Sequence, residues 1–294
     1  MTRTILSLVA CGTLLVACGD DTTGTGGGGE GGDGTGGSGQ TTTTSTSSMG
    51  TGGEGGGTTA ENAQIRVAHL SPDAPAVDVC VFTASDMLVA GPVLKGAGDT
   101  DGLAYPDATG YVPLPAGSYK FRIVAPNAAN CDTALAGLPD VGPLALAAGE
   151  SYTAAAVGSL TPPEGAQAFE VIALADNLGA PASGKAHLRF IHASSNVPNV
   201  DVGVAGATFT PVWSNIAYKS AGDYTPVDAP FTADVGAAIA GTGTPAIVFT
   251  DINIPAGAIV DVFAIGLLGG PAGQELGALA CVVGGDCFEL TQAD

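Results

Sequence analysis

Two stretches of this chain decide its fold, and they are copies of one another. Residues 65–81 read IRVAHLSPDAPAVDVCV, and residues 188–204 read LRFIHASSNVPNVDVGV. They align without gaps at an offset of 123 residues, and 8 of 17 positions are identical. A repeated stretch at a fixed offset indicates two copies of one structural unit.

Each copy has the pattern of two short β-strands joined by a turn. Apolar side chains fall on every second position around Val67 and again from Val77 to Val81, with Pro and Asp between the two runs. The same alternation recurs from Tyr119 to Ile123. Period-two patterning that is interrupted about every ten residues by Pro, Gly, Asp or Asn is typical of a β-sandwich. We therefore predict an all-β protein without long helices.

The length and the repeat together predict the domain organisation. The 232 residues from 63 to 294 suffice for two domains of ordinary size. We place the first β-sandwich at 63–180 and the second at 181–294. Before them we expect a signal peptide at 1–17 and a disordered tether at 18–62.

The beginning of the chain resembles a bacterial lipoprotein signal. Arg3 precedes an apolar run from Ile5 to Ala17, which is too short to span a bilayer. The run ends in small residues followed by Cys18, as in a lipobox, where the cysteine is acylated and becomes the first residue of the mature protein. Gly19 follows, rather than Asp, and this favours the outer membrane. The alternatives are an ordinary secretory signal cleaved near Ala17, or a chance cysteine.

The predicted tether has the composition of a flexible linker. From residue 20 to 62, 33 of 43 residues are Gly, Thr or Ser. Such a segment cannot bury enough apolar surface to offset the entropy of ordering it. We expect it to hold the folded domains away from a membrane surface.

The motifs of the two copies resemble a bacterial family, domain of unknown function 4397. The resemblance rests on HxSPDAPxVDV at 69–79, its second copy at 192–202, PAGxY at 115–119 and AGxxYTxxAVG at 148–158. It implies tandem immunoglobulin-like β-sandwich domains on secreted or lipid-anchored envelope proteins. It implies no activity and no catalytic residues.

The second copy departs from the motif at two positions. Ser195 and Asn196 stand where the first copy has Pro72 and Asp73. We therefore expect any role of Asp73 not to be shared by both copies.

Four cysteines follow the signal region, and they predict disulfides in an oxidising compartment. They are Cys80, Cys131, Cys281 and Cys287. Three pairings are possible. Proximity favours Cys281 with Cys287, which leaves Cys80 with Cys131. The alternative is a metal site, but the spacings contain no CxxC pair and the chain has only three histidines.

The two histidines at equivalent positions, His69 and His192, share strand parity with large apolar residues. We expect each ring to face the core or its rim and to bond the turn that follows its strand. A role as ligand or base is the less favoured alternative.

A second repeated set is charged. Arg66 and Asp78 of the first copy recur as Arg189 and Asp201. We predict that each Arg pairs with the Asp of its own domain, or bonds loop carbonyls, and so fixes strand register. A binding role is the alternative.

Composition excludes several classes of function. The chain has 8 Lys and Arg against 28 Asp and Glu, a formal charge of −20. Nucleic-acid binding is excluded because phosphate neutralisation needs basic residues. No catalytic or cofactor motif occurs in the predicted domains, so we expect no cofactor and no catalytic residue. Asp99 and Asp101 form only a fragment of a calcium loop. Trp213 is expected in the core, with a sugar platform as its alternative.

These observations predict a non-enzymatic envelope lipoprotein that serves display, adhesion or assembly. Its membrane contact would be the lipid anchor at Cys18, and its partners would be envelope, matrix or glycan molecules. The alternative is a glycan- or calcium-binding module of the cell envelope. An unrecognised hydrolase is a third and weaker hypothesis.

Overall fold

The computed structural model describes residues 61–135 and 138–293. The predicted signal peptide, the lipid site Cys18 and all but the last two residues of the predicted tether lie outside these residues. The described residues all belong to one compact unit. None of its helices is both long enough and apolar enough to cross a membrane.

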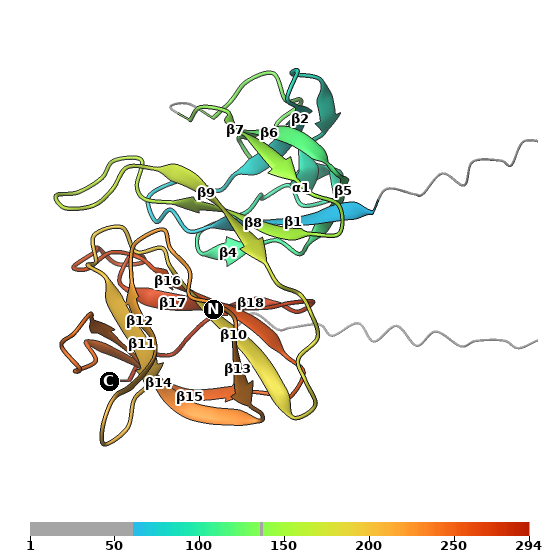
Figure 1. Cartoon of the computed structure of the whole chain (residues 1–294). Helices are drawn as coiled ribbons and strands as arrows, with labels where there is room; N and C mark the ends of the chain where they lie inside the picture. Colours follow the sequence, from blue (N-terminus) through green and yellow to red (C-terminus); the bar gives the residue numbers. More distant parts are fainter. Residues whose placement is uncertain (1–60, 136–137, 294) are drawn as a thin grey trace, which may run out of the picture. The chain divides into compact units, whose positions relative to one another are not determined.

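The fold is all-β, as the alternating pattern predicts. The described ranges hold four sheets and one short helix, α1 (Val93–Gly96) (Figure 1). Within them, each sheet takes its strands either from β1–β9, here called the first repeat, or from β10–β18, the second repeat. The division of the chain at residues 180 and 181 stays a prediction.

Each repeat has one sheet that contains its first strand, here called the inner sheet, and one outer sheet. The inner sheet of the first repeat has the order β4-β1-β8-β9, with β5 also paired to β1. Its outer sheet has the order β3-β2-β6-β7. The strands are β1 (Asn62–His69), β2 (Asp78–Thr83), β3 (Leu88–Ala90), β4 (Asp107–Ala108), β5 (Val112–Pro115), β6 (Gly117–Val124), β7 (Val141–Leu146), β8 (Ser151–Val157) and β9 (Glu170–Asp176).

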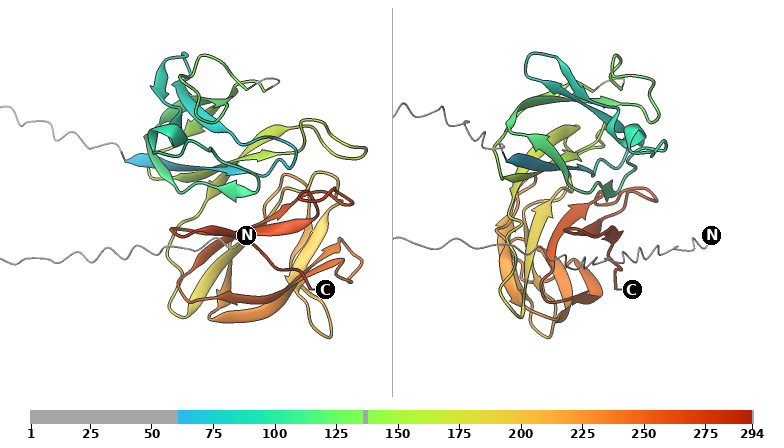
Figure 2. Two further views of the ribbon diagram at one scale, coloured as in Figure 1. Left: turned by 180° about the vertical axis from the view of Figure 1, so that it is seen from behind. Right: turned by 90° about the vertical axis from the view of Figure 1, so that its right-hand side faces the viewer.

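The second repeat follows the same plan. Its inner sheet has the order β13-β10-β16-β17-β18, and its outer sheet has the order β12-β11-β14-β15. Figure 2 shows these strands from two further sides. They are β10 (Lys185–His192), β11 (Val200–Val204), β12 (Thr210–Ile216), β13 (Thr225–Asp228), β14 (Phe231–Ile239), β15 (Ile247–Ile254), β16 (Ile259–Ile265), β17 (Gly277–Val282) and β18 (Cys287–Glu289).

Both inner sheets are centred on one parallel pair of strands. β1 lies parallel to β8 with Arg66 opposite Thr153, and β10 lies parallel to β16 with Arg189 opposite Asp261. The next strand along the chain, β2 or β11, joins the outer sheet instead. The two strands of each repeated stretch therefore belong to different sheets.

The inner sheets are buried on both faces. One face of each packs on its own outer sheet, around Phe121 in the first repeat and Phe190 in the second. The other faces pack on one another in a shared core that includes Leu70, Ile191 and Phe263, all fully buried. This explains why β8 and β16 read as nearly continuous apolar runs, the pattern of a strand covered on both sides.

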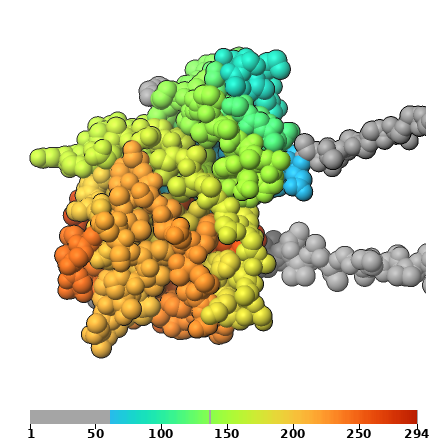
Figure 3. Space-filling model, in the orientation of Figure 1, coloured from blue at the N-terminus to red at the C-terminus, as the bar shows by residue number. Residues whose placement is uncertain are grey.

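The repeats differ in the connection between the third and fourth strands of the outer sheet. In the first repeat, residues 125–140 connect β6 to β7, whereas residues 240–246 connect β14 to β15. The longer connection is tied to β2 by a disulfide between Cys80 and Cys131, with Cα atoms 5.9 Å apart. The connection between β8 and β9 includes exposed residues 160–165 and projects from the surface (Figure 3).

The second disulfide joins Cys281 in β17 to Cys287 in β18. Both pairings are those that proximity along the chain favours, so the disulfide prediction is confirmed. Disulfides persist in oxidising compartments, which indicates a location outside the cytoplasm.

Candidate functional site

The shared core between the inner sheets contains a buried network of charged side chains. Its first member is Arg66 in the middle of β1, which is 2% exposed. The Arg66 Nε donates to Thr153 Oγ1 at 2.8 Å, and its Nη2 donates to Asp261 of the second repeat. Its guanidinium also lies over the rings of Tyr111 and Phe263. Arg66 therefore links the two repeats.

Arg189 makes the reciprocal link from the second repeat. Its Nε donates to Asp261 Oδ1 at 2.7 Å, beside it on β16. Its Nη2 donates to Asp176 Oδ1 at 2.5 Å, and its Nη1 donates to the carbonyl oxygen of Ala175 at 2.9 Å, both in β9 of the first repeat. The guanidinium lies 4.4 Å from the centre of the Tyr224 ring.

Each carboxylate of the network accepts three hydrogen bonds. Asp176 accepts from Arg189, from the Thr153 hydroxyl at 2.6 Å and from the Tyr111 hydroxyl at 2.8 Å. Asp261 accepts from both arginines and from the Tyr224 hydroxyl at 3.2 Å. The two arginines and two aspartates balance in charge.

The electrostatics of the network hold Tyr111, Tyr224 and Arg189 in one protonation state. Burial raises the pKa of Tyr111 and of Tyr224, so that both hydroxyls stay protonated and donate. Burial alone lowers the pKa of Arg189, but the charges of Asp261 and Asp176 and the hydrogen bond to Asp261 outweigh it and hold the pKa above its usual value. A paired and buried set of this kind is suited to joining two surfaces rather than to exchanging protons with a substrate.

The predicted pairing of each Arg with the Asp of its own repeat is wrong. Arg66 does not pair with Asp78, nor Arg189 with Asp201. The reason is that successive strands enter different sheets. Arg66, on the inner sheet, points away from the first sandwich and toward the second repeat. On the outer sheet, Val79 points into the core of the first sandwich, so its neighbour Asp78 points to the opposite face of that sheet. The two side chains lie on opposite sides of one sandwich.

The two aspartates hold loops instead. Asp78 accepts from the backbone N–H groups of Leu94 and Lys95, both at 2.9 Å, and so fixes the start of α1. Asp201 accepts from the N–H groups of Gly241 and Asn215. These two bonds lower the pKa of Asp201.

The histidines bond the turns that follow their strands, as predicted. His69 and His192 bond the carbonyl oxygens of Pro75 and Pro198 through Nε2, at 2.9 and 3.0 Å. Burial lowers the pKa of both rings, which favours their neutral form. Both histidines therefore have a local structural role.

The departure of the second copy at Asn196 does not remove the role of Asp73. Asp73 accepts from the backbone N–H groups of Leu160 and Thr161, after β8. Asn196 accepts from the N–H of Leu268 and donates to its carbonyl oxygen, after β16. The expectation that this role is not shared is wrong, because an amide oxygen accepts the same hydrogen bond as a carboxylate.

The residues considered for sugar or calcium binding are engaged in internal contacts. Trp213 packs on Phe190, with ring centres 6.4 Å apart, and donates through Nε1 to the carbonyl oxygen of Asp223. Asp99 Oδ1 accepts from the backbone N–H groups of Asp101 and Gly102. Within the ranges 61–135 and 138–293, no group of three or more His, Cys, Asp or Glu could hold a metal ion.

Sequence reasoning missed three main members of the network: Thr153, Asp176 and Asp261. A signal for one of them is present in the sequence. Asp261 is the only charged residue in the otherwise apolar run from Ile259 to Ile265. A lone charge in a strand with apolar neighbours of both parities indicates a buried ion pair, because a buried charge needs a partner. The partner itself could not be read from the sequence.

Comparison with known families supports the resemblance seen in the motifs. The model of the family described as "Domain of unknown function (DUF4397)" matches residues 63–203, which include the first copy of the repeated stretch and all but the last residue of the second. Comparison with curated proteins gives no match.

Two solved structures show only distant similarity. The Bacillus anthracis TIE protein is 11% identical with a TM-score of 0.19, and the match covers 70% of this chain and 34% of that one. This chain thus spans about a third of that protein. The second is a family CBM26 module from Eubacterium rectale Amy13K in complex with maltoheptaose. It is 10% identical with a TM-score of 0.22, and the match covers 69% and 92% of the two chains.

Proposed function

We propose that this chain is a non-enzymatic, lipid-anchored protein of the bacterial cell envelope that presents its two β-sandwich modules as one rigid body. The observation that carries the proposal is the buried network around Arg66, Arg189, Asp176 and Asp261 within a shared apolar core. Because desolvation offsets most of the Coulomb attraction in a buried pair, such a network serves chiefly to select one arrangement of the two repeats.

Two further observations support the location and the absence of catalysis. The disulfides of Cys80 with Cys131 and of Cys281 with Cys287 favour an oxidising compartment. The repeated polar residues hold turns, loops or the junction between repeats. A rigid body on a long Gly-rich tether suits display, adhesion or assembly at a surface, with the lipid at Cys18 as its anchor in the outer membrane.

Metabolic labelling with an alkyne-bearing fatty acid tests the anchor. We expect label on the mature protein in the membrane fraction, and loss of both label and membrane association in Cys18→Ala. Cys11→Ala is the matched control, because Cys11 is removed with the signal peptide in this proposal. Label that persists in Cys18→Ala, or that is absent from the unaltered chain, would refute a lipid anchor at this site.

Protease treatment of intact cells then tests display. Release of the two-repeat body from intact cells, through cleavage in the predicted tether, is the expected result. Protection until the outer membrane is broken would contradict surface display and would place the protein in the periplasm.

A further inference from the structure

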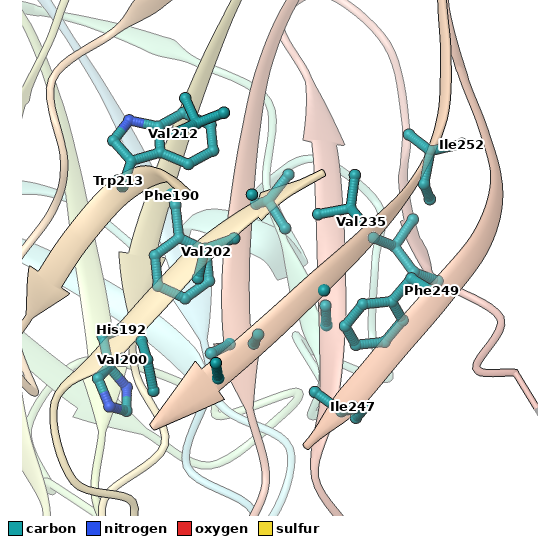
Figure 4. A pocket seen from close by; sticks show the side chains of 18 of the residues that line it. Phe190, His192, Val200, Val202, Val212, Trp213, Val235, Ile247, Phe249 and Ile252 are labelled. Atoms are coloured by element: carbon teal, nitrogen blue, oxygen red, sulfur yellow. The ribbon is translucent and has the colours of Figure 1, made fainter. Parts of the chain in front are cut away.

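The interior of the second sandwich is incompletely filled. A cavity of about 170 Å³ lies between its inner and outer sheets. Figure 4 shows Phe190 and Val202 on one side of this space and Val235 and Phe249 on the other. No Asp, Glu, Lys or Arg lines it. His192, on its wall, already uses Nε2 to bond Pro198.

The first repeat provides an internal comparison at the same place. Beside His69, between the same two sheets, the corresponding cavity is only about 30 Å³. The first repeat has another hollow of about 450 Å³ between the same sheets and next to α1, lined in part by Val67, Val79 and Phe121, but the exposed residues Asp99 and Asp107 also line it. The cavity of the second repeat is therefore distinguished by combining its larger size beside the histidine with a lining free of Asp, Glu, Lys and Arg.

Two substitutions between the repeats account for part of the difference. Ile123 lies opposite Val79 in the first outer sheet, and Ala237 lies opposite the equivalent Val202 in the second. On the inner sheets, Val171 of the first repeat corresponds to Ala278 of the second. Both changes remove side-chain volume from the half of the sandwich nearest His192.

At two other positions between the sheets, the second repeat has the larger side chains. Phe190 stands where the first repeat has Val67, and Phe249 stands where it has Val141. Val235, opposite Phe249, in turn stands where the first repeat has Phe121, so the large side chains are arranged differently in the two sandwiches.

The loop between β6 and β7 adds a further apolar side chain to the interior of the first repeat. Leu138, which is 7% exposed, packs from this loop onto Val77 and Ile123. The corresponding connection of the second repeat, residues 240–246, is shorter and contributes only Ala246 to the cavity wall. No leucine of the second repeat takes the place of Leu138 there.

The cavity is open to solvent through an apolar rim. Val212, Ile239 and Leu268 are 40%, 45% and 59% exposed, and all three line the cavity. A cavity without charges and with exposed aliphatic side chains at its entrance offers an apolar molecule burial without loss of hydrogen bonds.

We propose that the second sandwich binds a small, uncharged apolar molecule between its sheets, of the size of one aromatic ring or a short alkyl chain. The size follows from the volume, since a dry apolar cavity of about 150 Å³ accommodates benzene. The ligand is held by contact with Phe190, Val202, Val235 and Phe249, and the rim residues cover its outer end.

Benzene is the probe for this site. With the purified full chain, we expect benzene to raise the Tm by about 3–6 °C when its concentration exceeds the Kd about tenfold. Saturation-transfer NMR should show transfer from the protein to benzene. The absence of both effects would overturn the proposal.

Variants that copy the first repeat locate the site. Ala237→Ile supplies the side chain found at Ile123, and it should abolish both the benzene-dependent shift and the saturation transfer. Thr232→Ile is the matched control, because it adds an isoleucine on the exposed face of the same strand, β14, and should leave binding unchanged. Undiminished binding in Ala237→Ile would overturn the assignment.

A second filling variant guards against failure of the first to fold. Ala278→Val approaches the cavity from the inner sheet and copies Val171, and it should weaken benzene binding at least tenfold. Sedimentation of the unaltered chain tests the rival occupant, a second copy of the protein. A dimer that Ile239→Asp dissociates, together with no benzene binding, would replace the ligand by a second copy.

Discussion

At the scale of single residues, a charged side chain can have its main partner far away in the sequence and close by in the structure. Arg66 and Arg189 recur at an offset of 123 residues, and each bonds a carboxylate of the other repeat. Their shared partner, Asp261, is fully buried and accepts hydrogen bonds from both. This one carboxylate therefore compensates charge on two strands that lie far apart in sequence.

We predict that Asp261→Asn lowers the free energy of unfolding by about 3–5 kcal/mol, because it leaves buried guanidinium charge without a partner. Urea unfolding followed by circular dichroism measures the change. Asp228→Asn is the matched control, since Asp228 pairs with Lys185 but its side chain is 93% exposed, and it should change stability little. Similar losses in the two variants would contradict a central role for the buried network.

At the scale of elements, the turns after β8 and β16 explain a repeated glycine. Gly158 and Gly266 have φ values of 78° and 75°, a region that favours glycine. At Gly266, an added Cβ would lie 1.9 Å from the carbonyl oxygen of Glu275, and at Gly158 it would lie 2.2 Å from that of Ala168. The AVG and AIG endings of the two repeats thus reflect a close approach of two backbones.

We predict that Gly266→Ala destabilises the protein by about 2–4 kcal/mol, through backbone strain and the clash with Glu275. Gly257→Ala separates the two causes. Gly257 has a φ of 84° but open space around the position of a Cβ, so its variant should lose only the smaller part due to strain. Thermal unfolding of both variants is the measurement, and an equal loss would exclude the clash as a cause.

At the scale of the whole molecule, the shared core makes the two repeats one structural body. Phe263, fully buried between the inner sheets, contacts residues of both repeats within that core, and the charge network lies beside it. Burial of both faces of each inner sheet means that neither repeat could be removed without exposing an apolar surface to water.

We predict that the two repeats unfold together, in one calorimetric transition. Phe263→Ala should cost about 3–5 kcal/mol and divide the unfolding into two transitions. Phe121→Ala, in the core of the first sandwich alone, is a truncation of equal size and should lower stability without removing the contact between repeats. Scanning calorimetry distinguishes these results, and two transitions in the unaltered chain would refute the prediction.

The sequence was sufficient for the properties that depend on local pattern. Alternating apolar residues predicted the all-β sandwich fold, because a strand with one buried face has a period of two. The distances along the chain predicted the pairing of Cys281 with Cys287 and thereby of Cys80 with Cys131. Strand parity and the adjacent proline-containing turn predicted the surroundings of His69 and His192.

Only the tertiary structure decided which distant surfaces meet. The sequence shows Arg66 and Asp78 close together along the chain, but their strands enter opposite sheets, and sheet order is set by packing between elements far apart in sequence. For the same reason the cavity beside His192 could not be foreseen. It depends on Ala237, Ala278 and the absence of a counterpart to Leu138, three features on separate elements that only the fold brings to one place.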